Sequence, residues 1–267
     1  MRRYLDFYLT TMKVAVMEQF QYPLANYFYM IGMMAEPVIY LVVWSTVAVQ
    51  QGGQVGGYTP GEFAAYYIIW TLVRNMNIVF TPYGWEWRIK EGRLSMELLR
   101  PIHPVHSDVA FFAGWKVVVI ILWLPLAAFL SWFFHPTFYI TPLKVLVFFL
   151  AIWGAYLIRT MLLSILGMIT FWTTRVSAIF ELYFAAELVL SGRLVPMSLM
   201  PPFVQQLAAY LPFQWTFAFP IETMAADLTP AQLFGGLAMQ AFWIVAGVLG
   251  LNLLWRLGIR RYSAVGN

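Results

Sequence analysis

The residues best placed to do chemistry in this sequence are four charges set in long apolar runs. They are Glu36, Arg74, Arg159 and Glu187. Charged residues make up 10% of the 267 positions and hydrophobic residues 61%, so charges in such surroundings are exceptional. An isolated charge is costly in hydrocarbon, and each must find a partner, water or a protein surface. The chemistry open to them is ion pairing between helices or the lining of a path for a polar solute.

The depth of these charges along the expected helices predicts which of them meet. Glu36 and Arg74 each lie near the middle of an apolar run, so we expect them to contact each other. Arg159 precedes the turn at Thr174 by fifteen residues (174 − 159), and Glu187 follows it by thirteen (187 − 174). At about 1.5 Å per residue, this second pair lies within roughly one helical turn in depth. Such contacts commonly hold helices together, and lining a substrate path is the alternative role.

No catalytic or metal-binding constellation accompanies these charges. His103 and His106 lie three residues apart with Asp108 nearby, but a proline separates them and His135 falls on the opposite side of the expected membrane. A zinc site needs more ligands than these. The chain has no cysteine, and it lacks the Gly-Lys pair that belongs to a phosphate-binding loop. We therefore expect no catalytic residue, metal or cofactor in this chain.

The elements that position the four charges are predicted to be membrane-spanning helices. Mean hydropathy is +0.72, and a soluble domain carries roughly 25% charged residues. A spanning helix needs about 20 apolar residues, so we predict an all-α integral membrane protein in which residues 1–267 form a single transmembrane domain. Its six predicted spans are residues 24–49, 62–80, 109–134, 143–172, 176–190 and 235–255.

The flanking segments and the basic residues predict how the chain lies in the membrane. Residues 1–22 repeat apolar side chains at three- and four-residue steps, which predicts an amphipathic helix in the membrane interface. With the N-terminus inside, twelve Lys and Arg residues, Lys116 among them, lie inside, and only Lys144 and Arg193 lie outside. Because basic residues favour the cytoplasmic side, we expect a multi-pass protein of the plasma (inner) membrane of a prokaryote with both termini cytoplasmic. The net charge of +4 then needs no nucleic-acid partner.

Two polar regions interrupt the apolar runs. Residues 85–101, in an expected cytoplasmic loop, combine charges with aliphatic side chains. A short amphipathic helix of this kind suits a helix-in-groove contact with a partner, whereas a plain surface loop would need fewer aliphatic residues. Residues 191–229, on the outside, contain five prolines that forbid one continuous helix. Within that region, Glu222 and Asp227 are expected to be solvated charges at a helix end.

The motifs in these two regions resemble the permease subunits of type-2 ABC exporters, and the resemblance covers essentially the whole chain. The motifs are Glu91-Gly92-Arg93-Leu94, Leu98-Leu99-Arg100-Pro101 and Leu190-Ser191-Gly192-Arg193-Leu194-Val195-Pro196. The resemblance implies a cytoplasmic coupling helix at about 87–100 and re-entrant half-helices within 191–229, before the last span. The residues it assigns to coupling with an ATPase are Arg88, Glu91, Gly92, Arg93, Leu94, Leu98, Leu99 and Arg100.

The resemblance further implies the membrane-spanning, non-enzymatic subunit of an ABC transporter that exports a substrate. A second permease subunit, identical or homologous, would complete the pathway in contact with membrane lipid, and separate ABC ATPase subunits would bind ATP and Mg. An amphipathic small molecule or drug, as in multidrug efflux, is the expected substrate. Aromatic cations suit the aromatic content of 18%, with Glu36 or Glu187 as charge partner.

Other transport and enzyme classes remain open at this point. Export of lipid or polysaccharide also occurs among such permeases. The intramembrane charges would suit a secondary transporter driven by an ion gradient, although the two halves of the chain show no obvious internal repeat. A membrane-embedded enzyme acting on lipid is a third class, but no cluster of catalytic residues gathers at one membrane face.

Overall fold

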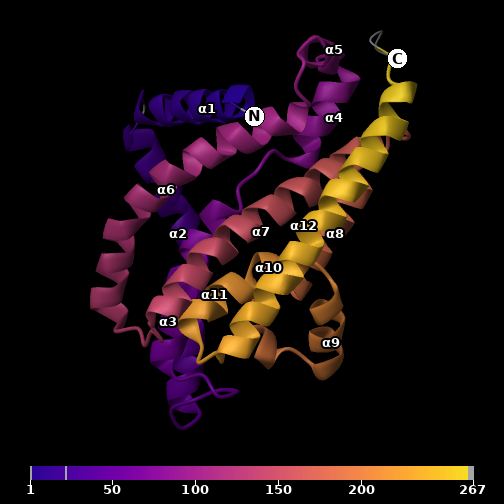
Figure 1. Cartoon of the computed structure of the whole chain (residues 1–267). Coiled ribbons are helices and arrows are strands. Elements are labelled where there is room, and N and C mark those ends of the chain that lie inside the picture. The colour runs from indigo at the N-terminus through magenta and orange to yellow at the C-terminus, as the bar shows by residue number, and fades with distance from the viewer. Residues whose placement is uncertain (1, 22, 264–267) are drawn as a thin grey trace.

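The computed structural model describes residues 2–21 and 23–263, and in these ranges the regular elements are helices (Figure 1). This agrees with the all-α prediction. In chain order the elements are α1 (Arg2–Gln21), α2 (Pro23–Gln50), α3 (Pro60–Met76), α4 (Pro82–Lys90), α5 (Leu94–Leu98), α6 (Pro104–Phe134), α7 (Pro142–Met168), η1 (Ile169–Phe171), α8 (Ser177–Leu190), η2 (Met197–Leu199), α9 (Pro202–Tyr210), α10 (Phe213–Thr216), α11 (Ala218–Ala225), α12 (Pro230–Gly258) and η3 (Ile259–Arg261).

Threonine–proline pairs begin four of the helices. In each pair the threonine hydroxyl accepts a hydrogen bond from a backbone N–H of the first turn. The proline fixes φ at the first helical position, where a backbone N–H would have no partner within the helix. Two of these starts add the reciprocal bond of a capping box, supplied by Glu62 and by Gln232. The four capping residues are Thr59, Thr81, Thr141 and Thr229.

Four helices in the described part of the chain are long and apolar enough to cross a membrane. They are Leu24–Gln50, Pro104–Phe134, Pro142–Phe171 and Pro230–Arg261. By contrast, α3 has 17 residues and α8 has 14. At about 1.5 Å per residue they measure about 25 Å and about 21 Å, less than the roughly 30 Å of a hydrocarbon core. The structure therefore supports four of the six predicted spans, and those at 62–80 and 176–190 fall short.

Both short helices end where the chain turns inside the bundle. α3 stops before Asn77, and the chain runs without regular structure until α4 begins at Pro82. α8 stops before Ser191, and Gly192 then takes a left-handed φ of 80° that redirects the chain. Apolar residues continue past the end of α3 to Phe80, so hydropathy alone extends that span too far, whereas the predicted limit at residue 190 coincides with the end of α8.

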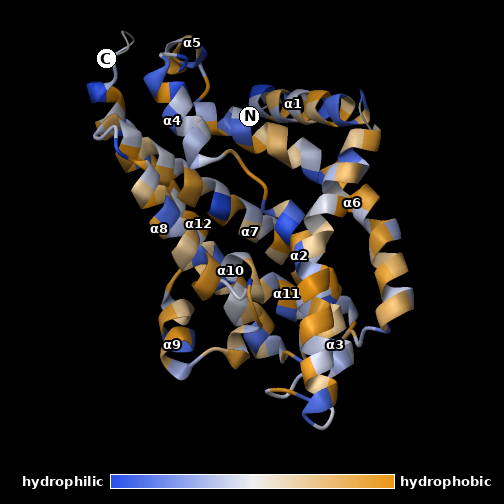
Figure 2. Cartoon of the chain, turned by 180° about the vertical axis from the view of Figure 1, so that it is seen from behind, coloured by the Kyte–Doolittle hydropathy of each residue, from blue (hydrophilic) through white to orange (hydrophobic). Residues whose placement is uncertain are grey.

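α3 forms the centre of the bundle. Thirteen of its 17 residues are buried, as expected of a helix that is apolar on nearly all sides. It packs against α2, α6 and α11, while α7 packs along α12. Large apolar side chains are exposed along α6, and Figure 2 colours much of this helix as hydrophobic. A helix that exposes many large apolar side chains is expected to contact lipid or another protein.

The two ends of the bundle differ. α1, the α4–α5 segment and the C-terminal end of α12 lie at one end, and the α2–α3 loop and α9 lie at the other (Figure 1). α1 lies across α6 and packs closely there, because a side-chain carbon at Gly114 would come within 2.4 Å of the Met12 carbonyl oxygen. Tyr8 of α1 also hydrogen-bonds His106 Nδ1 at 2.7 Å.

Candidate transport site and coupling element

The predicted coupling region, residues 85–101, forms two short helices instead of one. α4 ends at Lys90, and Gly92 adopts a φ of 68°, a left-handed conformation that favours glycine. The chain then turns into α5, which ends at Leu98. The expectation of a single amphipathic helix is therefore wrong, because the sequence places a helix-terminating glycine at its centre.

Arg88 fixes this segment to the rest of the bundle. Its two terminal nitrogens donate to both carboxylate oxygens of Asp108 at 3.0 and 2.9 Å, and its Nε lies 3.0 Å from Glu97. The guanidinium also stacks over the rings of Phe80 and Trp85. Such a bidentate, charge-assisted contact is strong and directional. Arg88 is buried, so its contribution to any docking surface is to hold α4 and α5 in place.

The exposed surface of the segment is carried by α5 and the residues around it. Leu99 is 79% exposed and Met96 70% exposed, although both side chains are large and apolar. Glu91, Arg93 and Arg100, which the sequence assigned to ATPase coupling, are exposed as well. Leu98 is also exposed, at 39%, whereas Leu94 is fully buried. Of the eight assigned residues, Arg88 and Leu94 therefore point inward.

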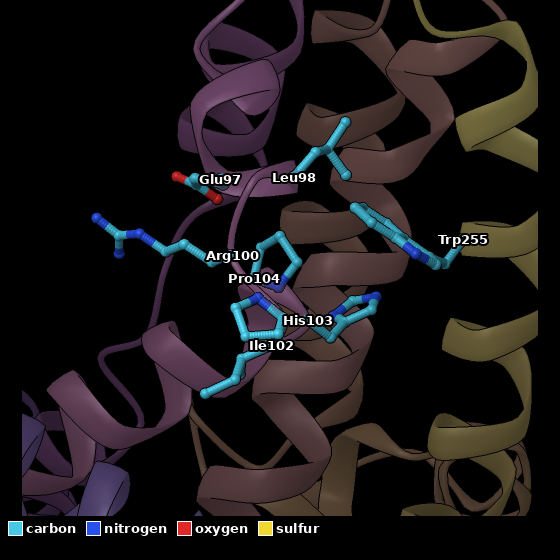
Figure 3. A pocket seen from close by; sticks show the side chains of 8 residues that line it. Glu97, Leu98, Arg100, Ile102, His103, Pro104 and Trp255 are labelled. Carbon is cyan, nitrogen blue, oxygen red and sulfur yellow. The ribbon is translucent and has the colours of Figure 1, made fainter.

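A hollow of about 250 Å³ separates α5 from the end of α12 (Figure 3). It is bordered by Leu98 and Arg100 on one side and by Trp255 on the other. His103 lies against the Trp255 ring at a centroid distance of 4.2 Å. Burial, reinforced by the nearby His106, lowers the pKa of His103 to about 4. The His103 side chain that borders the hollow is therefore uncharged at neutral pH.

Glu36 and Arg74 lie together, as their depth predicts. The Arg74 guanidinium donates to Glu36 Oε2 at 2.5 Å, which confirms this pair. Arg193, from the segment after α8, also reaches Glu36 Oε2 at 3.4 Å, and both guanidiniums lie over the ring of Trp70. Arg193 was expected outside the membrane. It lies instead beside the middle of α2, because the chain after α8 turns back into the bundle.

Side chains of α3 hold that returning segment. The hydroxyls of Tyr66 and Tyr67 and the indole N–H of Trp70 donate to the three consecutive backbone carbonyls of residues 192–194. Irregular backbone is tolerated at membrane depth only where protein or water satisfies it. Gly192 is required here, since a side-chain carbon at that position would meet another side-chain carbon at 2.7 Å. Two tyrosines and a tryptophan close together on one apolar helix could have indicated, from the sequence alone, that α3 binds a backbone segment.

Arg159 and Glu187 form the second predicted pair, and the structure confirms the contact. Arg159 donates to both Glu187 oxygens, at 2.9 Å from Nε and 2.8 Å from the terminal nitrogen. The Glu187 side chain is 1% exposed and that of Arg159 13%. A further Arg159 nitrogen donates to the Asn77 carbonyl at 2.5 Å. The pair therefore joins α7 and α8 to the point where α3 ends.

Lys116 is a buried charge that sequence reasoning missed. It was counted among the cytoplasmic basic residues, but its side chain is fully buried in α6. Its ammonium donates to the backbone carbonyls of Asn75 and Ile78. Cations are favoured at the C-terminal end of a helix, where carbonyls lack partners. The signal was its position, since it lies well inside the predicted span 109–134.

The two external carboxylates have different surroundings. Asp227 is 81% exposed and lies 3.4 Å from Lys144, which agrees with a solvated charge. Glu222 is only partly exposed, and it borders a cavity of about 420 Å³ between α10–α11 and the first turns of α12. The expectation that Glu222 is a solvated charge is therefore wrong, since the Met197 amide donates a hydrogen bond to its carboxyl and Tyr58 and Tyr66 lie close to it.

A protein-family model described as "ABC-2 family transporter protein" matches residues 34–266. A comparison with curated proteins finds no match. The match includes the coupling segment, both arginine–glutamate pairs and the returning segment after α8. The chain therefore belongs to the ABC-2 family of transporter proteins, a type-2 ABC permease family.

Proposed function

We propose that this chain is the permease subunit of an ATP-driven exporter in a prokaryotic inner membrane, and that α5 is where a separate ATPase docks. ABC-2 permeases work with ABC ATPase subunits. The observation that carries the proposal is the exposed pair Met96, on α5, and Leu99, directly after it, which are set among charges at the end that holds both termini. Apolar anchors within a charged rim are typical of a docking surface.

The contacts around α4 support the idea that a displacement of the α4–α5 segment is transmitted to the rest of the bundle. Trp85 is fully buried, and it packs so closely on Gly167 of α7 that a side-chain carbon there would lie 2.3 Å from it. Together with the Arg88–Asp108 pair, this contact ties α4 to both α6 and α7. A displaced α5 would therefore move these helices as a rigid body, which is how packed interfaces convert small shifts into large ones.

The Glu36 cluster supports a second permease subunit or a water-filled path beside α2. Side-chain exposures are 20% for Arg74, 31% for Glu36 and 22% for Arg193. Charges at this depth are too costly to leave against lipid. Protein or water would cover them in the membrane, and a second permease, identical or homologous, would provide that cover and complete the pathway for an amphipathic small molecule.

The pairing of the intramembrane carboxylates favours ATP over an ion gradient as the energy source. Glu36 and Glu187 are the groups that a gradient-driven carrier would protonate or load with an ion. Each is ion-paired with arginine, so a cation of the protein already occupies its carboxylate oxygens. Together with the family, this pairing favours the ATP-driven reading.

Purification from the native host in mild detergent tests the proposal. The test variant is Glu91→Lys in the coupling segment, and the matched control is Glu18→Lys on α1, which reverses an equally exposed carboxylate elsewhere at the same end. We expect an ATPase subunit and ATP hydrolysis to co-purify with the wild type and the control and to be lost from the test variant. An ATPase that is consistently absent, or that remains bound equally in both variants, would contradict the proposal.

A further inference from the structure

The cavity between α10–α11 and α12 has the size and composition of a ligand site. Its volume of about 420 Å³ falls in the range of pockets that bury drug-sized ligands. The rings of Trp215 and Phe219 line it with their centroids 5.8 Å apart and their planes tilted by 60°. Glu222, one helical turn beyond Phe219, lines the same cavity. Two aromatic residues and one acidic residue therefore border the same partly open cavity.

Glu222 differs from the other interior carboxylates in having no cationic partner. Glu36 is paired with Arg74 and Glu187 with Arg159. In the part of the chain that the structure describes, no basic side chain lies within ion-pair distance of Glu222. The Met197 amide is within reach of its carboxyl, but an amide carries no formal charge. A partly buried carboxylate without a cationic partner is less favourable than a paired one, so this site gains from a bound cation.

We propose that this cavity binds a monovalent aromatic or amphipathic organic cation, with Glu222 as its charge partner and Trp215 and Phe219 as its aromatic walls. Aromatic faces attract organic cations, and a carboxylate that is partly shielded from water adds to the attraction. The inference rests on the proposed function, since it names the substrate class of the exporter. It also moves the expected charge partner from Glu36 and Glu187, which are already paired.

Two adjacent glycines in α12, Gly235 and Gly236, differ in the space around them, so substituting one of them can test the cavity without disturbing the packing. A side-chain carbon at Gly236 would lie 2.0 Å from the Phe219 ring, so that glycine is needed for packing. At Gly235, which also lines the cavity, nothing lies within 4 Å of such a carbon. Gly235→Leu should therefore fill part of the cavity without a clash, and leucine favours the helix more than glycine does.

Equilibrium dialysis of the purified transporter with its co-purified subunits tests the proposal. The probes are tetraphenylphosphonium and tetraphenylborate, which have similar size and shape and opposite charge. The variants are Glu222→Gln, which removes the charge, and Gly235→Leu, which occupies the space. Their matched controls are Asp227→Asn, a solvated carboxylate nearby, and Ala238→Leu, an exposed small residue of the same helix that is outside the cavity lining.

We expect the wild type to bind the phosphonium and to discriminate against the borate. Glu222→Gln should weaken phosphonium binding roughly tenfold or more, the usual effect of losing a charged partner. Gly235→Leu should weaken both probes, and neither control should change binding by more than about twofold. Equal binding of both probes, or unchanged phosphonium binding in both test variants, would overturn the inference.

The ATPase activity of the same preparations separates this inference from the proposed function. A preparation that retains its ATPase but does not discriminate between the probes refutes the cation site and leaves the exporter proposal standing. A preparation that binds the phosphonium through Glu222 without any ATPase supports the site and contradicts the ATP-driven reading.

Discussion

The Arg159–Glu187 pair gives the sharpest prediction about stability. Glu187→Gln keeps the shape of the side chain but leaves Arg159 charged in a place where it is 13% exposed. Breaking a buried pair in this way costs about 3–5 kcal/mol, whereas ordinary hydrogen bonds between membrane helices average nearer about 0.6 kcal/mol. One acceptor survives in glutamine, so we expect about 3 kcal/mol. Arg159→Gln combined with Glu187→Gln should recover a large part of that loss.

Reversible unfolding in mixed dodecyl maltoside and dodecyl sulfate micelles measures this free energy. The matched control is Glu181→Gln, on the same helix, whose exposed carboxylate accepts one hydrogen bond from Tyr83 at 2.7 Å. That control should shift the free energy of unfolding by less than about 1 kcal/mol. If Glu187→Gln costs no more than the control, or the double variant is as unstable as the sum of both single variants, the reasoning from an uncompensated buried charge is refuted.

Three further predictions follow from the interior contacts, each measurable by thermal unfolding in detergent. Gly192→Ala should cost at least about 2 kcal/mol, more than Gly57→Ala, which has a similar φ of 87° but open space around it; equal losses would mean that the packing is unimportant. Lys116→Met should cost roughly 2 kcal/mol because carbonyls at the end of α3 lose their donor, and no loss would contradict that role. Burial lowers the pKa of His103 to about 4, so between about pH 6.5 and 4 the unfolded state binds a proton that the folded state does not. The free energy of unfolding should therefore fall as the pH drops through this range. His103→Asn, which keeps the helix cap, should reduce this dependence on pH.

Pairing at matched depth was predictable from the sequence. The positions of Glu36 and Arg74 within their apolar runs, and of Arg159 and Glu187 about the turn at Thr174, were enough to identify both contacts. This works because helix rise is constant and an unpaired charge in hydrocarbon is costly. The threonine–proline pairs could also have placed four helix starts more accurately.

Features that depend on packing between distant segments were not predictable in the same way. Arg193 reaches Glu36 only because α3 holds the segment that follows α8. The hydropathy of the sequence does not predict this contact. The surroundings of the Glu222 carboxyl come from segments far earlier in the chain or in another loop, namely Tyr58, Tyr66 and the Met197 amide. Lys116 was misplaced because it was counted as cytoplasmic although it lies inside the predicted span 109–134, and its ammonium donates to a carbonyl at the end of α3.

Cysteine cross-linking at α5 tests the central claim of ATPase docking most directly. The chain contains no cysteine, so Leu99→Cys introduces a single reactive thiol at an exposed apolar position, and Leu94→Cys on the same short segment is a buried control. A reagent with one maleimide and one succinimidyl ester would be applied to the native complex. We predict a product containing the ATPase subunit from Leu99→Cys and none from Leu94→Cys. Efficient labelling of Leu99→Cys without any ATPase product would contradict docking at α5.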